Sequence, residues 1–322
     1  MRSVVFSRHG PAPDVVTLAD RPRPRPGAGE LLVRMTARPV NPSDELFIEG
    51  RYGRRPTLPA VPGFEGVGTV EETTTGGPAV GQRVAVAAQG TWQEYVAVPA
   101  ADVVPVPDRL ADSAACQLTV NPLTALLLTR ELALRDGDWL LITAAGSALS
   151  RMVLHLAYRT GVRCVCVVRN RGHDDDLTRA GAAAVINTAV EDLVARVREV
   201  TGGEGVHATL DAVGGELGTA AIQCLRDGGQ AVVLGMFDGG TLALTPHTLV
   251  FRSITVRGFW LPHIVSKQTA EVLAELSKHA VELLSTPDFA APVAATYDLA
   301  DVATALDHVR QPGRRGKVIL TG

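Results

Sequence analysis

The sequence predicts an α/β protein with two domains, one β-rich and one built around a doubly wound parallel sheet. Three observations support this fold class. A strand, a small-residue turn, a helix and a second strand follow one another between residues 140 and 170. Short strands broken by Gly and Pro fill the first third of the chain, and from about residue 113 helices alternate with apolar strands. Short strands with Gly- and Pro-rich turns are typical of barrels, whereas alternating helices and strands are typical of parallel sheets.

The central segment has the sequence LLITAAGSALSRMVLHLAYRTGVRCVCVVRN. Residues 140–143 and 165–168 are apolar runs of the kind that is buried in a parallel sheet. Between them, an apolar stripe at helical spacing predicts a helix that ends before Gly161. The N-terminus of such a helix presents free N–H groups to a phosphate, so we expect a dinucleotide site here.

The turn of this unit departs from the glycine-rich pattern G-x-G-x-x-G, because it has Gly146 among small residues and Ser150 near its end. A purely structural crossover is therefore the alternative interpretation of the turn. If the site binds a cofactor, the residues that face it are expected to be Ala145, Gly146, Ser147, Ala148 and Leu149.

The end of the second strand bears on the choice of cofactor. At this point an NAD site places an acidic residue for the ribose, and an NADP site places an arginine. The chain has Arg169 and Arg171 here, and its acidic residues arrive only at positions 174–176. This pattern favours NADPH, the alternative being that both arginines are solvated loop charges.

Composition excludes several classes of protein. The 322 residues carry a formal net charge of −3, which offers no basic surface for nucleic acid or an anionic membrane. We find no run of about 18 apolar residues that could span a bilayer, and the N-terminal apolar run is too short for a signal peptide. The four cysteines lack metal-ligand spacing and are expected to be reduced, so we expect a cytoplasmic protein.

The other elements follow in order. The β-rich part has predicted strands at 30–37, 63–70, 83–87 and 92–98. The second part has predicted helices at 123–134, 190–200 and 266–284, and further strands at 184–186, 208–213, 230–234 and 254–259. A tail of strand and helix from 293 onwards is expected to complete the first domain. We place the domains at 1–112 with 285–322, and at 113–284.

Several motifs in the chain resemble those of the medium-chain dehydrogenase/reductase superfamily. They are NPSDELFIEGRYG (41–53), PAVPGFEGVGTV (59–70), AAGSALSRM (144–152), LDAVGG (210–215), GFWL (258–261) and GRRGKVIL (313–320). NPSD…Y and GFWL are most similar to the zinc-independent 2-enoyl thioester reductases of the mitochondrial type, and then to the quinone oxidoreductases. The resemblance implies a GroES-like catalytic domain, an NADP-binding Rossmann domain and a homodimer joined through the sixth Rossmann strand. It also implies cofactor contacts from Gly235, Phe259 and Lys317.

The same motifs argue against a catalytic metal. Zinc dehydrogenases of the superfamily that the chain resembles carry Cys where it has Asn41 and His where it has Phe64, and neither replacement is a usual zinc ligand. We therefore expect no zinc. Dehydrogenation of a simple alcohol then lacks its Lewis acid, whereas reduction of a polarised C=C bond needs only a hydrogen-bond donor at the carbonyl oxygen and a proton source.

The resemblance also suggests the catalytic residues. Tyr52 matches the tyrosine proposed as the acid of the enoyl thioester reductases, the alternative being an ordinary surface tyrosine. Trp260 matches a residue that borders the substrate, the alternative being packing or a dimer contact. Asn41 is expected to hydrogen-bond the substrate or the nicotinamide ribose.

Three functions are compatible with these residues. The first is NADPH-dependent reduction of an α,β-unsaturated acyl thioester, as enoyl-CoA or enoyl-carrier protein, or of a related enone. The second is NADPH-dependent quinone reduction, which would depend little on Tyr52. The third is NADPH binding without catalysis. The match of residues 41–53 to the enoyl thioester reductases favours the first function.

Overall fold

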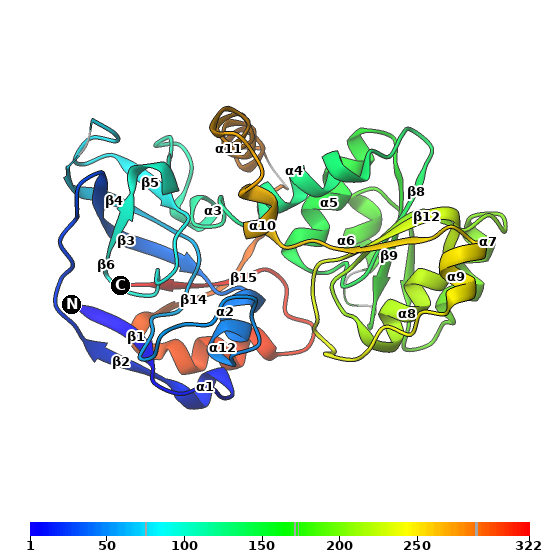
Figure 1. The fold of residues 1–322 in the computed structure, drawn as a ribbon, viewed down its shortest axis with the longest axis horizontal. Coiled ribbons are helices and arrows are strands. Elements are labelled where there is room, and N and C mark those ends of the chain that lie inside the picture. Colours follow the sequence, from blue (N-terminus) through cyan, green and yellow to red (C-terminus); the bar gives the residue numbers. More distant parts are fainter. Residues whose placement is uncertain (75, 171, 173, 287–288) are drawn as a thin grey trace. The chain divides into compact units, whose positions relative to one another are not determined.

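The computed structural model describes residues 1–74, 76–170, 172, 174–286 and 289–322. The chain forms two compact units (Figure 1). Unit 1 consists of Met1–Leu123 and Ala274–Gly322, and unit 2 consists of Thr124–Leu273. The sequence suggested domain boundaries at 112/113 and 284/285. The structure extends unit 1 past residue 112 because the short helix α3 (Asp112–Ala115) still packs on strands of its sheet.

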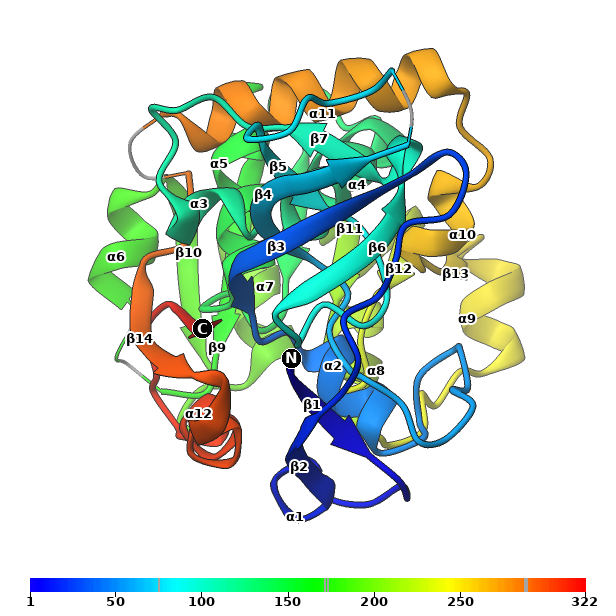
Figure 2. The ribbon, with the colours of Figure 1, turned by 90° about the vertical axis from the view of Figure 1, so that its left-hand side faces the viewer.

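Unit 1 is built around a mainly antiparallel sheet. Within the described residues its strand order is β14-β15-β3-β4-β5-β7, and β6 pairs with β3. The strands are β3 (Glu30–Pro39), β4 (Gly66–Thr73), β5 (Arg83–Val86), β6 (Tyr95–Pro99), β7 (Val103–Pro105), β14 (Val293–Asp298) and β15 (Lys317–Thr321). Figure 2 shows β3 between β4 and β6. Because β15 pairs with β3, the tail of the chain belongs to this sheet.

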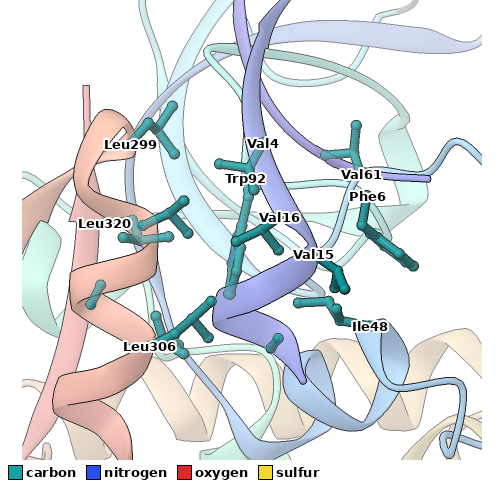
Figure 3. Close-up of a cluster of buried hydrophobic side chains, with 14 of the residues drawn as sticks. Val4, Phe6, Val15, Val16, Ile48, Val61, Trp92, Leu299, Leu306 and Leu320 are labelled. Carbon is teal, nitrogen blue, oxygen red and sulfur yellow. The ribbon is translucent and has the colours of Figure 1, made fainter. Parts of the chain in front are cut away.

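A hydrophobic core lies beside this sheet. It joins the hairpin β1 (Arg2–Phe6) and β2 (Val16–Asp20) to the helices α1 (Ala12–Val15), α2 (Pro42–Ile48) and α12 (Val302–Arg310). Figure 3 shows its centre, with Trp92 between side chains from both ends of the chain. The remaining short elements of unit 1 are the 3-10 helices η1 (Ala100–Asp102) and η3 (Leu299–Asp301).

Unit 2 contains the parallel sheet that the sequence predicted. Its strand order is β10-β9-β8-β11-β12-β13, and all neighbouring pairs are parallel. The strands are β8 (Trp139–Ile142), β9 (Arg163–Val168), β10 (Ala182–Asn187), β11 (Val206–Asp211), β12 (Leu225–Val233) and β13 (Thr255–Gly258). In chain order this is 3-2-1-4-5-6, the order of dinucleotide-binding sheets. The prediction of a doubly wound sheet is confirmed.

Helices connect these strands. They are α5 (Ala148–Arg159), α6 (Asp174–Arg179), α7 (Leu193–Val200), α8 (Gly215–Gln223), α9 (Pro246–Phe251) and α10 (Leu261–Val265), while α4 (Asn121–Leu132) and α11 (Ala270–Leu284) run across the boundaries of the two units. The predicted helix at 266–284 is shorter than expected, because Thr269 Oγ1 accepts the N–H of Val272 and α11 starts only after this residue. In the described part of the chain no helix is both long and apolar enough for a membrane span. All four cysteines are buried and free, as predicted.

Candidate active site

The first group of candidate residues lies at the carboxyl edge of the parallel sheet in unit 2. All six strands end at this edge, and the strand order reverses between β8 and β11. Ligands of open α/β sheets bind in the crevice outside such a switch point. The turn from β8 to α5 lies there, so the predicted cofactor segment occupies the expected place in the fold.

Hydrogen bonds of two serines hold the turn, one of which is Ser150, near the position where the glycine-rich pattern would have its last glycine. Ser147 is the N-cap of α5 and accepts the N–H of Ser150, while the Ser150 hydroxyl donates to the Thr143 carbonyl at 3.3 Å. Ala144 takes the left-handed conformation, with φ of 46°, that a glycine usually supplies. The serines therefore fasten the start of the helix to the end of β8.

Backbone donors remain available in this turn. Among the described residues, the N–H groups of Gly146, Ala148 and Leu149 have no hydrogen-bond partner. Together with the N-terminus of α5 they form a set of donors suited to an anion. Ala145 differs from them, because its methyl group is buried and its N–H donates to the Val167 carbonyl. Its N–H is therefore not available to a phosphate.

The other predicted residues of unit 2 lie at the same edge. Arg169 is exposed directly after β9, the neighbour of β8, whereas Arg171 lies outside the described residues. Gly235 follows β12, and a Cβ at this position would lie only 2.5 Å from the Ala212 carbonyl oxygen after β11. Phe259 follows β13 and its side chain is buried, which suits packing better than an open contact surface. Trp260 is 37% exposed and precedes α10.

Sequence analysis overlooked two residues that hold the switch point together. Asp211 is buried at the end of β11 and accepts hydrogen bonds from the Thr143 hydroxyl at 2.8 Å and from the N–H groups of Val213 and Gly214. Thr143 in turn accepts the N–H of Ala212 at 3.0 Å. The motif LDAVGG contained the signal, since an Asp that ends an apolar strand must find partners once it is buried.

The second group of candidates lies in unit 1, around the loop that follows α2. The Tyr52 N–H donates to the Leu46 carbonyl at the end of α2. Its ring packs on Phe64 with 5.0 Å between ring centroids, and Phe64 packs edge-on against Phe47 of α2 at 5.2 Å. Tyr52 is therefore a half-buried residue whose ring is in contact with Phe64.

Beside this loop lies a buried polar cluster that the sequence did not predict as a unit. It consists of Asn41, Asp44, Glu65 and Lys317, which are 3%, 0%, 1% and 6% exposed. The Asn41 amide donates to Glu65 at 2.9 Å, and its oxygen accepts from the Lys317 ammonium. Because both ends of this amide are engaged within unit 1, Asn41 is poorly suited to the substrate or ribose contact that the sequence suggested. Lys317 is likewise a weaker candidate for a cofactor contact.

Further bonds fix the two carboxylates of the cluster. Glu65 Oε2 accepts the N–H groups of Thr119 at 3.1 Å and Val120 at 3.0 Å. Asp44 Oδ2 accepts the Asn41 N–H at 2.7 Å. The other carboxyl oxygen, Asp44 Oδ1, is buried and has no hydrogen-bond partner in the described structure. Burial raises the pKa of Glu65, raises the pKa of Asp44 to about 8, and lowers the pKa of Lys317.

Comparison with known proteins identifies the family of this fold. Residues 27–108 match the alcohol dehydrogenase GroES-like domain, and residues 148–278 match the zinc-binding dehydrogenase domain. The chain is 30% identical to the mitochondrial enoyl-[acyl-carrier-protein] reductase of Arabidopsis thaliana over 270 residues, which are 81% of this chain and 72% of that protein. The chain belongs to the medium-chain dehydrogenase/reductase superfamily. The family predicted from the motifs is therefore confirmed, and the chain is a member of an oxidoreductase superfamily.

Two solved structures resemble the whole chain. A crystal structure of a Bacillus thuringiensis protein assigned as an NADPH:quinone reductase is 34% identical, with a TM-score of 0.94, and covers 100% of this chain and 98% of its own. The quinone oxidoreductase of Escherichia coli, solved in complex with NADPH, is 25% identical, with a TM-score of 0.93, and the alignment covers 100% of both chains.

Positions 41 and 64, where the motif resemblance puts zinc ligands, hold side chains that are not usual zinc ligands. The Asn41 side chain is committed to Glu65 and Lys317, and Phe64 packs between two rings. Among the described residues, no three His, Cys, Asp or Glu side chains are grouped so that they could hold a metal ion.

Proposed function

We propose that this protein reduces the C=C bond of an α,β-unsaturated acyl thioester, as enoyl-CoA or enoyl-carrier protein, or of a related enone, with NADPH. The observation that carries the proposal is the packing of the Tyr52 ring on Phe64. Tyr52 lies in a loop whose motif resembles that of the enoyl thioester reductases. The similarity to a mitochondrial enoyl-[acyl-carrier-protein] reductase points in the same direction.

NADPH fits the carboxyl edge of the unit 2 sheet. The unpartnered N–H groups of Gly146, Ala148 and Leu149 would hold its pyrophosphate, and the exposed Arg169 would pair with its 2′-phosphate. Gly235 lies so close to the end of β11 that a Cβ would clash with the Ala212 carbonyl oxygen, and we propose that its backbone borders the nicotinamide half. When bound, NADPH would supply a hydride for the β-carbon of the substrate.

Tyr52 has the complementary role in this proposal. Hydride addition at the β-carbon leaves negative charge on the carbonyl oxygen and a carbanion-like α-carbon. The Tyr52 hydroxyl would donate a hydrogen bond to this oxygen or a proton to the α-carbon, so that one hydride and one proton are added across the double bond. We also propose that Trp260, which is partly exposed beside the sheet edge, borders the acyl chain.

Quinone reduction is the second candidate, because both structural relatives named above carry quinone reductase names. A quinone oxygen can take its proton from water, so this activity would depend little on Tyr52. NADPH binding without catalysis is the third candidate and would give binding with no turnover.

A substrate panel with one substitution separates the three candidates. NADPH oxidation is measured with a 2-enoyl-CoA, an enone and a quinone, for the parent protein and for Tyr52→Phe, which keeps the ring and removes the hydroxyl. General acid assistance contributes about 10²- to 10⁴-fold, so kcat for the enoyl substrate should fall by about that factor while NADPH affinity stays constant. Preferred turnover of the quinone, unchanged in Tyr52→Phe, would overturn the proposal, and NADPH binding without any turnover would support the third candidate.

We further propose that the protein is a homodimer joined through β13. This strand is the outermost of the described unit 2 sheet, and α9 beside it exposes Leu249, Val250 and Phe251. An open strand edge and a neighbouring apolar surface together favour pairing with a second copy. The four buried, free cysteines suit a reducing compartment, and we propose a cytoplasmic location.

A further inference from the structure

The buried cluster of Asn41, Asp44, Glu65 and Lys317 has no part in the chemistry proposed so far. It nevertheless holds two carboxyl groups and one ammonium in the interior of unit 1, where ionised groups are stable only if they are paired. Lys317 is a cation bonded directly to it, through Asn41. Its place in the cluster therefore needs an explanation.

One connection leads from the cluster to Tyr52 along helix α2. Asn41 is the N-cap of α2, and Asp44 closes a capping box by accepting the Asn41 N–H. The Lys317 ammonium fixes the side chain of the same Asn41. At the other end of α2, the Leu46 carbonyl accepts the N–H groups of both Arg51 and Tyr52. The direction of α2 therefore sets the backbone of Tyr52.

A second connection leads to the ring of Tyr52. Glu65 is fixed by Asn41 and by two backbone N–H groups at 3.0 and 3.1 Å. The preceding residue, Phe64, carries the ring on which Tyr52 packs. The backbone and the ring of Tyr52 are thus held from two directions, and both connections meet at the Asn41 amide, whose two ends bind Glu65 and Lys317.

We propose that Lys317 is a positioning residue for Tyr52, which acts through the Asn41 amide on helix α2 and through Glu65 on Phe64. The inference rests on the proposed function, because it assigns the cluster to the acid of that reaction. Lys317 itself touches neither substrate nor reacting atoms in this proposal. A displacement of about 1 Å of a catalytic group can cost about a hundredfold in rate, so a buried support of this kind is expected to have a large kinetic effect.

A double-mutant cycle tests the inference. The variants are Lys317→Met, Tyr52→Phe and the two combined, and the measured quantities are kcat for the enoyl substrate and the Kd of NADPH. If Lys317 acts through Tyr52, Lys317→Met lowers kcat by about tenfold or more in the parent but by only about twofold or less in the Tyr52→Phe background. The Kd of NADPH stays within about twofold. Lys317→Arg, which keeps the cation, restores part of the rate.

Hydrogen exchange supplies a readout that does not depend on activity. Backbone amides of residues 42–52 should exchange faster in Lys317→Met than in the parent, because the cap of α2 has lost its support. Lys278→Met is the matched control, since Lys278 is exposed in the same unit, on α11, and the described structure shows no bond between it and the cluster. It should leave both exchange and kcat unchanged.

The outcomes separate the inference from the proposed function. If Tyr52→Phe alone keeps the parent rate, the proposed role of Tyr52 fails, and the inference fails with it. If Tyr52→Phe is slow but Lys317→Met lowers the rate by the same factor in both backgrounds, only the inference is overturned. A weaker Kd for NADPH with unchanged kcat would make Lys317 a cofactor contact. If Lys317→Met fails to fold, it is combined with Glu65→Gln, which removes the Lys317 and Glu65 charges together. This double variant then takes the place of Lys317→Met in the cycle with Tyr52→Phe.

Discussion

At the scale of single residues, Asp44 shows what burial does to an ionisable group. Its carboxyl is completely buried, has one unpartnered oxygen, and has its pKa raised by burial to about 8. An unfolded Asp has a pKa of about 3.9, so the folded state binds this proton more tightly. The contribution to stability is fully present below about pH 4 and is lost as the pH rises towards about 8.

Asp44→Asn should therefore change the pH dependence of stability. Asparagine cannot ionise, and its amide oxygen can still accept the Asn41 N–H. We expect the variant to gain stability over the parent between pH 5 and pH 8, by roughly 2 to 4 kcal/mol at the upper pH. Urea unfolding at both pH values measures this gain. The same difference between variant and parent at both values would contradict the assigned protonation state.

The proposed preference for NADPH rests on Arg169. It is exposed at the end of β9, next to the turn with free N–H groups. A guanidinium–phosphate contact contributes on the order of 1.5 to 3 kcal/mol, so Arg169→Ala should weaken NADPH binding about ten- to a hundredfold. NADH has no 2′-phosphate and serves as the internal control, with Kd for both cofactors measured by fluorescence titration. An equal loss for both would mean that Arg169 has a structural role.

At the scale of elements, the loop before β4 depends on one glycine. Gly63 has a φ of +95°, and a Cβ there would lie 2.3 Å from Trp92 Cδ1 and 2.4 Å from Thr91 Oγ1. The next two residues are Phe64, which supports Tyr52, and Glu65 of the buried cluster. The geometry of this loop therefore affects both the core and the candidate site.

Gly63→Ala should destabilise the protein by about 2 to 4 kcal/mol, since strain at positive φ adds to overpacking against Trp92. Gly76→Ala is the matched control, because Gly76 is exposed and a Cβ there would meet nothing within 4 Å. It should change stability by less than about 1 kcal/mol. Thermal unfolding of both variants measures the contrast, and similar shifts in Tm would show that the loop can relax.

Sequence periodicity was sufficient for the elements with long apolar patterns. The strands and helices around the central unit were predicted because buried parallel strands are continuous apolar runs. The helices α2 and α8 were not predicted. The first is a seven-residue helix that starts with Pro42, and the second contains Gly215 and Gly218, which lower helix propensity.

The candidate site was predictable only in part, because some of its residues are close together in the sequence and others are far apart. The β8–α5 turn and Arg169 are local in sequence, and so they could be found from spacing alone. The buried cluster could not, because Lys317 and Asn41 are 276 residues apart and meet only when β15 pairs with β3. No local pattern distinguishes a buried Lys or Asp from an exposed one. Their roles follow from burial and partners, which only the folded chain supplies.

At the scale of the whole molecule, the outer edge of unit 2 carries the prediction of a homodimer. On α9, Val250 and Phe251 are 66% and 77% exposed, and no residue of this helix is buried. Burying such side chains is favourable, and a monomer leaves them in water. A second copy that extends the sheet from β13 would cover them. We therefore expect a solution mass of twice 33.9 kDa by sedimentation equilibrium.

A charge in this surface tests the interface. Phe251→Asp should shift the protein towards monomers, because a carboxylate in an apolar interface loses its hydration, while the folded unit keeps its core. Val190→Asp is the matched control, since Val190 is 69% exposed after β10, the strand at the opposite edge of the sheet. Its mass should equal that of the parent. A dimer that survives Phe251→Asp with undiminished affinity would place the contact on another surface, and the open edge of β13 would then need a different explanation.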